Sequence, residues 1–209
     1  MSTLDEVYRR LEEQMKVVYQ LKIVLLGFRP QIMRRVQVPA LISLDGLHGV
    51  IQDAMGWTNS HLHMFLIGTN QYSATYEPGD LDEMNMLDER NAGSLADLIT
   101  EPRTKFLDNY DFGDDWDHEI TFERAVARQP AVKYSYCLLG KRACPPEDCG
   151  GTTGYAELLK VLQNPTHPEY KEMRAWAGRR FDPEAFDLQK VNKRIQRTEY
   201  REFIGFTER

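Results

Sequence analysis

The sequence predicts one α+β domain, a mostly antiparallel sheet with helices packed on it and a helical C-terminal quarter. Segments of alternating apolar and polar residues, separated by short turns, recur through the first two thirds of the chain, as in β-hairpins. After residue 150 the apolar residues follow helical spacing instead. The 209 residues, 42% of them hydrophobic, are enough to bury one core without disulfides.

The N-terminal part predicts a helix and then a hairpin. Thr3 and Glu6 can form a capping box, so we expect an amphipathic helix over residues 1–16 and a single domain over residues 17–209. From Tyr19 the apolar period changes to two, which predicts a strand over residues 19–25 and, after a Gly/Pro turn, a second over residues 32–38.

The middle of the chain predicts a second layer and further hairpins. Ser43 is a favourable N-cap for a helix over residues 44–55. Strands are expected over residues 61–67, 72–76, 104–110, 116–122 and 134–139, with an acidic loop over 77–91 and a short helix capped by Ser94. Further helices are expected over residues 155–162 and 170–177. A last helix is expected to end near Ile195, with its N-cap at either Asp182 or Asp187.

The charge is unevenly distributed along the chain. The net charge is −6, but residues 77–119 hold fourteen acids and three bases, which fits solvated loops or an acidic surface for a cation or a basic partner. Residues 189–209 have six bases and three acids. This weakly basic tail keeps open a role as a DNA-binding accessory protein, although a nucleic-acid surface needs a denser cluster.

Composition also indicates the compartment. No apolar run approaches the about 20 residues of a membrane span, and acids interrupt the first helix where a secretory signal would be apolar. Three cysteines are too few for a disulfide scaffold. We therefore expect a cytoplasmic protein without a membrane partner.

Histidines and aspartates form the main candidate site. His61 and His63 are two apart on an expected strand, so their side chains share one face, and His118 is expected on a neighbouring hairpin. The candidate metal or ligand residues are His61, His63, His118, Asp111, Asp114 and Asp115. If the hairpins are neighbours, they could hold a divalent ion such as zinc or manganese and ionise a bound water. The alternative is that the histidines are core residues and the aspartates shape a turn.

Two further groups are candidates for weaker reasons. The loop candidates are Cys144, Glu147, Asp148 and Cys149, which could form part of a zinc site or simply a rigid loop; the spacing is not that of a Cys-x-x-Cys redox pair. Arg34 and Arg35 lie on opposite faces of a strand. The inward one is expected to pair with Asp114 or Asp117, or else to contact an anion such as phosphate.

Five motifs in order resemble one family. They are IMRRVQVP at residues 32–39, HLHMF at 61–65, YDFGDDWDH at 110–118, CPPEDCGG at 144–151 and FDPEAFD at 181–187. The chain resembles the open-reading-frame-three-like proteins of the root-inducing plasmid pRi, also labelled TnpR-like or insertion-element passenger proteins; Met33 stands where the family usually has Trp. The resemblance implies an α+β domain and carries no reaction with it.

These observations favour a binding or interaction domain associated with plasmids or mobile elements, with no established reaction and no established cofactor. Its ligand would be an unknown protein, a small molecule or a metal. The alternatives are a metal-dependent hydrolase or nuclease that uses the His/Asp cluster, and a DNA-binding accessory protein. Nucleophilic serine catalysis has no support, because no Gly-x-Ser-x-Gly elbow is present.

Overall fold

A computed structural model describes residues 3–74, 81 and 85–202. It contains an eight-stranded sheet in the order β5-β4-β3-β6-β7-β1-β2-β8, in which every neighbouring pair is antiparallel except β4 and β5. The strands are β1 (Val17–Leu25), β2 (Ile32–Pro39), β3 (His63–Ile67), β4 (Asn70–Ser73), β5 (Leu87–Asp88), β6 (Lys105–Tyr110), β7 (Trp116–Ala127) and β8 (Tyr136–Lys141). The predicted α+β class is confirmed.

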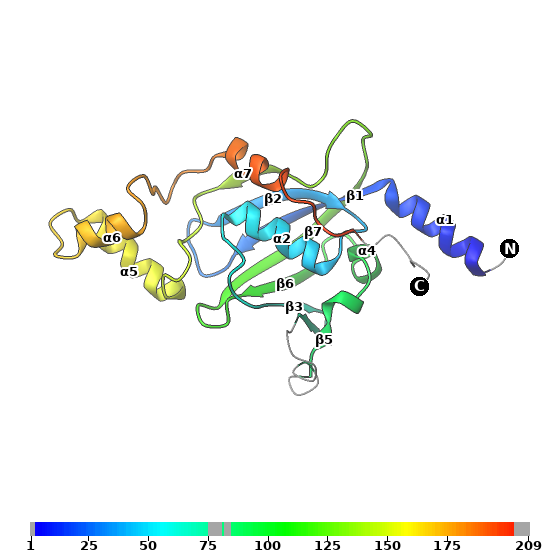
Figure 1. Ribbon diagram of the computed structural model, residues 1–209, viewed down its shortest axis with the longest axis horizontal. Helices are drawn as coiled ribbons and strands as arrows, with labels where there is room; N and C mark the ends of the chain where they lie inside the picture. Colours follow the sequence, from blue (N-terminus) through cyan, green and yellow to red (C-terminus); the bar gives the residue numbers. More distant parts are fainter. Residues whose placement is uncertain (1–2, 75–80, 82–84, 203–209) are drawn as a thin grey trace.

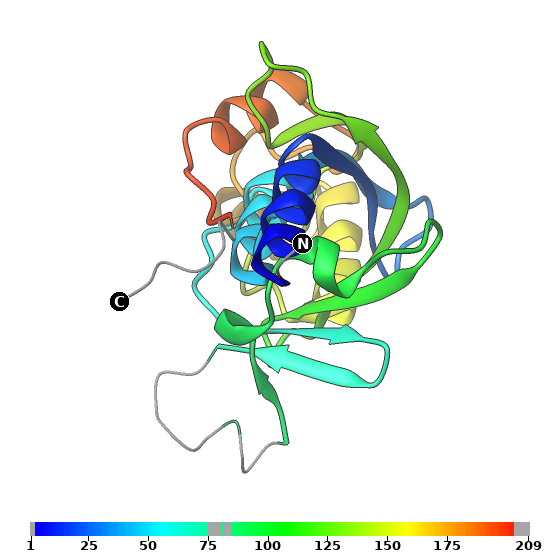
Figure 2. The same ribbon diagram turned by 90° about the vertical axis from the view of Figure 1, so that its right-hand side faces the viewer.

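Helix α2 (Leu44–Met55) lies against one face of this sheet, and α7 (Leu188–Ile195) packs on α2 and β8. Figure 2 shows the sheet curving around the helices on this inner face. Ser43 caps α2 through its hydroxyl, as expected, and Gly56 ends it at φ +106°, a backbone angle that favours glycine.

The other helical elements lie at the ends of the sheet (Figure 1). Helix α1 (Thr3–Met15) extends from one end, while α5 (Gly151–Gln163) and α6 (Tyr170–Trp176) lie together beyond the opposite end. The 3-10 helix η1 (Glu89–Asn91) and the short helix α4 (Leu95–Leu98) follow β5.

The core fills the space between the inner face of the sheet and α2. Alternate residues of the central strands, among them Leu21, Ile23 and Val36, are fully buried there with Leu47 and Ile51 of α2. The outer face of the same strands is covered by polar groups, such as the bidentate pair of Arg35 and Glu123 at 2.7 Å for each bond. The alternation of apolar and polar residues along the strands therefore predicts correctly which side chains face the core.

Several element boundaries differ from the expectation. Strand β3 begins at His63, so His61 lies in the preceding loop and does not share a strand face with His63, and β7 continues to Ala127. The last helix begins at Leu188, where the Asp187 side chain accepts from Lys190 N at 2.9 Å; the Asp182 side chain accepts from Glu184 N instead and shapes a turn. The expected strand over residues 72–76 ends at Ser73 within β4, and its last two residues lie outside the described part of the chain. In that part, no helix is both long and apolar enough to cross a membrane.

Candidate functional site

Three of the sequence motifs meet at the loops on one end of the sheet. The first segment joins α2 to β3, the second is the turn between β6 and β7, and the third leads from β8 into α5. Asp111 N donates to Leu62 O at 2.9 Å, which joins the first two segments. Gly150 N donates to Asp114 Oδ2 at 3.1 Å, which joins the second to the third.

Glu147 links all three segments. Its carboxylate accepts hydrogen bonds from Thr58 N at 3.1 Å, from Thr58 Oγ1 at 2.6 Å and from Tyr110 Oη at 2.7 Å. The Tyr110 oxygen in turn accepts from Ser60 N at 3.1 Å. Burial alone would raise the pKa of Glu147, but the bonds from Thr58 and Tyr110 hold it below its usual value. Glu147 thus serves as an ionised anchor between the loops.

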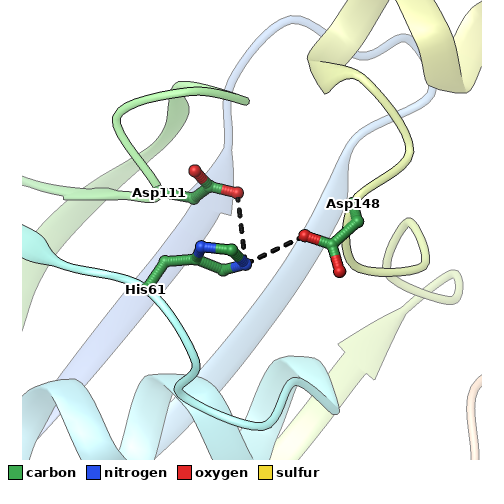
Figure 3. Close-up of side chains that lie close together, drawn as sticks. All are labelled: His61, Asp111 and Asp148. Carbon is green, nitrogen blue, oxygen red and sulfur yellow. Dashed lines mark hydrogen bonds and ion pairs between the residues drawn. The ribbon is translucent and has the colours of Figure 1, made fainter.

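His61, Asp111 and Asp148 converge at this junction, one from each segment (Figure 3). His61 Nε2 lies 2.9 Å from Asp148 Oδ1 and 3.6 Å from Asp111 Oδ2. One ligand atom from each residue lies within 4.8 Å of the other two. We call these three residues the surface triad, because the Asp148 side chain is 72% exposed and that of His61 33% exposed.

The turn geometry directs one oxygen of Asp111 into the triad. Asp111 has φ +58°, a left-handed conformation that aspartate tolerates. Its Oδ1 accepts from Gly113 N at 3.0 Å and from Asp114 N at 3.3 Å, so Oδ2 is the atom that faces His61. A ligand oriented in this way by backbone donors loses little freedom on binding a metal.

The donor set suits a divalent metal. One imidazole and two carboxylates are ligands for Zn²⁺ or Mn²⁺. Three protein ligands leave coordination positions open for water or for another molecule. A pocket of about 340 Å³ lies beside the triad, and its lining residues are Ser60, His61, Leu62, Asp111, Phe112 and Gly113.

His63 and His118 belong to a separate buried network. Asp108 and His118 are directly opposed on β6 and β7, and the Asp108 carboxylate lies 3.2 Å from His118 Nδ1 and 2.9 Å from His48 Nδ1. The His48 ring stacks on the His63 ring with centroids 3.5 Å apart and planes at 3°. His63 Nε2 lies 2.9 Å from Glu89 Oε2.

Charge in this network is distributed unequally. Burial alone would raise the pKa of Asp108, but His48 and His118 lower it well below its usual range, so the carboxylate is ionised. Burial lowers the pKa of His48. Burial also opposes the charge on His63, yet the bond to Glu89 and the charge of Asp108 raise its pKa. The stacked pair therefore holds one neutral ring and one ring that protonates readily, which avoids two like charges in contact.

The structure places the six predicted candidates in three settings. His61 and Asp111 lie in the surface triad, and His63 and His118 lie in the buried network. Asp114 accepts from Gly150 N, and Asp115 accepts from Asn109 Nδ2 at 2.6 Å, so both stabilise the turn region. Asp148 joins the triad from the loop candidates, whereas sequence reasoning missed His48 and Asp108.

The loop cysteines are not in the triad. All three cysteines of the chain are free, and burial raises the pKa of Cys149 to about 12 and that of Cys144 still further. Both thiols are therefore protonated at neutral pH. Within the described ranges, the one group of potential ligands close enough to share a metal contains neither of them.

Arg34 is the inward arginine, but its partners differ from the expected carboxylate. Its guanidinium donates to the main-chain oxygens of Ala54, Met33 and Lys141 at 2.8 to 2.9 Å. Ala54 lies in the last turn of α2, where the helix dipole favours a cation. Asp114 and Asp117, the expected partners, accept from Gly150 N and from Asn109 Nδ2.

Comparisons with known proteins agree with this fold. Residues 17–190 match the family described as plasmid pRiA4b ORF-3-like protein, which confirms the resemblance given by the five motifs. The chain is 37% identical over 182 residues to the uncharacterised protein y4hQ of Sinorhizobium fredii, covering 85% of this chain and 90% of that protein. A crystal structure of MM3350, a protein of unknown function from Methanosarcina mazei Go1, is 37% identical with a TM-score of 0.74, covering 84% of this chain and 97% of that one.

Proposed function

The chain belongs to the plasmid pRiA4b ORF-3-like family, and we propose that it is a binding domain that holds a divalent metal ion at His61, Asp111 and Asp148. The metal is Mn²⁺ or Zn²⁺, because the set mixes one imidazole with two carboxylates. Its open positions face the adjacent pocket and take a small ligand with an oxygen donor. Three free cysteines support a reducing compartment such as the cytosol.

The observation that carries this proposal is the convergence of three ligand atoms from three separate segments. The segments are also joined by bonds that do not involve the triad, above all those from Glu147 to Thr58 and Tyr110. The triad is therefore held in place before any ion arrives. Such support of the ligands by neighbouring hydrogen bonds raises the affinity of metal sites.

The proposal is tested by calorimetric titration of the protein with Mn²⁺ and with Zn²⁺, after removal of bound metal. We expect one ion per chain for the wild type and at least about tenfold weaker binding for Asp148→Asn. Asp114→Asn is the matched control, because an amide oxygen can still accept from Gly150 N and the residue lies outside the triad. Equal affinity in the wild type and Asp148→Asn would disprove the metal site.

Metal-dependent hydrolysis is the second candidate function. Three protein ligands with an adjacent pocket are the arrangement in which a metal lowers the pKa of a bound water. The metal-loaded protein can be assayed against phosphodiesters and esters. Turnover that is lost in Asp148→Asn but kept in Asp114→Asn would make the protein an enzyme; metal binding without turnover supports the binding domain.

A further inference from the structure

A second cavity, of about 630 Å³, is lined by Glu147 of the loop that carries Asp148. It is an open cleft lined by the C-terminal end of α2, residues 142–147, the segment between α6 and α7, and α7 itself. Its charged lining residues are Arg34, Arg142, Arg179, Arg180, Lys190, Arg194, Asp53, Glu147, Asp182 and Asp187. Cations outnumber acids by two in this lining, and by one once Arg142 is paired with Glu184, which lies outside the lining.

The Arg34 guanidinium is a buried charge without a counter-ion. The residue is 2% exposed, and in the described part of the chain its guanidinium bonds are to main-chain oxygens only, from Nε and Nη1. The nearby thiols of Cys137 and Cys144 do not neutralise it, because burial raises the pKa of both. A buried charge held in this way is costly unless an anion joins it.

The acids around the cavity are already engaged. Asp53 accepts from Tyr200 Oη at 2.6 Å and from Thr198 Oγ1 at 2.8 Å. Glu147 is the loop anchor described above, and Asp187 caps α7. The side chains of three cations, by contrast, make no hydrogen bond or ion pair within the described ranges: Arg179, Arg180 and Lys190.

Aromatic rings form part of the wall beside Arg34. The Arg34 guanidinium lies 4.7 Å from the centre of the Phe186 ring. Phe186 packs so closely against Gly140 of β8 that a Cβ atom there would overlap the ring. Phe181 and Pro145 also line the cavity, so an apolar group can be accommodated next to the buried cation.

We propose that this cavity binds a small organic phosphate. The Nη2 group of Arg34 meets the phosphate at the inner end, and Arg179, Arg180 and Lys190 meet it from the opening. The organic part of the ligand lies against Phe181 and Phe186. Phosphate is favoured over a single carboxylate because its larger negative charge and additional acceptor oxygens suit the four lining cations that have no carboxylate partner among the described residues, Arg34, Arg179, Arg180 and Lys190.

The test is calorimetric titration with three probes, phenyl phosphate, inorganic phosphate and phenol, at constant ionic strength. EDTA is present throughout, so that phosphate bound to a metal at the surface triad does not contribute. We expect phenyl phosphate to bind about tenfold tighter than inorganic phosphate and phenol not to bind. Failure of all three probes to bind would overturn the proposal and would leave the metal proposal untouched.

Variants locate the binding. Arg34→Met should weaken phenyl phosphate binding by at least about tenfold, whereas Arg35→Met, which alters the neighbouring arginine on the outer face, should leave it unchanged. If Arg34→Met does not fold by circular dichroism, the exposed pair Arg179→Ser/Arg180→Ser replaces it and should weaken binding several-fold. Undiminished affinity in the variant that folds would overturn the proposal.

Discussion

The surface triad and the buried network combine the same chemical groups in opposite environments. In the triad His61 meets Asp111 and Asp148 with Asp148 72% exposed, whereas His118 and Asp108 of the network are 0% exposed. In the network one oxygen of the Asp108 carboxylate bonds to His48, and the other lies 3.2 Å from His118 Nδ1, which bonds to the main-chain oxygen of Asp108. In the triad His61 and Asp111 line a pocket and Asp148 is exposed, so a metal can reach all three. Exposure, rather than residue type, separates the candidate site from a structural element.

Asp108→Asn should give the largest loss of stability. It removes the buried charge that His48 and His118 contact, and breaking such a pair costs about 3–5 kcal/mol. Because His48 and His118 hold the pKa of Asp108 low, its contribution is present above about pH 3.9, the ordinary value, and is lost as pH falls. Urea unfolding at several pH values should show a lower free energy of unfolding for the variant, and a smaller decrease of that free energy as the pH falls. The same pH dependence in the variant and the wild type would contradict this role of Asp108.

Glu89→Gln should have the next largest effect. It replaces the buried carboxylate that contacts His63, and a hydrogen bond to a charged group contributes about 1.5–3 kcal/mol. The pKa of His63 is raised, so this contribution is present below about pH 6.5 and is lost as pH rises through the pKa of the folded protein. NMR titration should find a lower pKa for His63 in the variant, and an unaltered pKa would refute the assignment.

Tyr110→Phe should weaken the link between the loops. The change removes the donor to Glu147 and the acceptor for Ser60 N, for a loss of about 1 kcal/mol. If Glu147 holds the triad in place, metal affinity should also fall by about tenfold. Thermal unfolding and metal titration measure the two effects separately; a stability loss with full metal affinity would show that the link does not support the triad.

Asp148→Asn should have the smallest effect on stability. The side chain is mostly exposed, so the metal-free variant should unfold within about 0.5 kcal/mol of the wild type. The loss of unfolding free energy is then expected to be about sixfold or more larger for Asp108→Asn than for Asp148→Asn, although the substitution is the same. A loss comparable to that of Asp108→Asn would show that the triad is structural.

The sequence predicted the sheet better than it predicted the site. The alternation of apolar and polar residues predicted which strand residues face the core, and Ser43 predicted the start of α2. Both signals depend only on residues that are close together in the sequence. The site depends on contacts between distant segments. Asp148 was assigned to the cysteine loop, and nothing local shows that this loop folds back onto His61.

The missed residues have physical reasons of their own. His48 follows the apolar spacing of α2, so it reads as one more core position rather than as half of a stacked pair. Asp108 lies on a strand whose alternate residues point inward, but only the register with β7 shows that it opposes His118. For Arg34, the sequence predicted a carboxylate partner, whereas the end of α2 supplies carbonyl oxygens.

The most direct measurement is anomalous diffraction from crystals grown with Mn²⁺. We predict an anomalous peak about 2.0–2.2 Å from His61 Nε2 and from one oxygen each of Asp111 and Asp148. We expect no peak at His118, which Asp108 already contacts. Crystals grown with Zn²⁺ complete the test, and the absence of a peak at the surface triad with both Mn²⁺ and Zn²⁺ at saturating concentration would contradict the metal site.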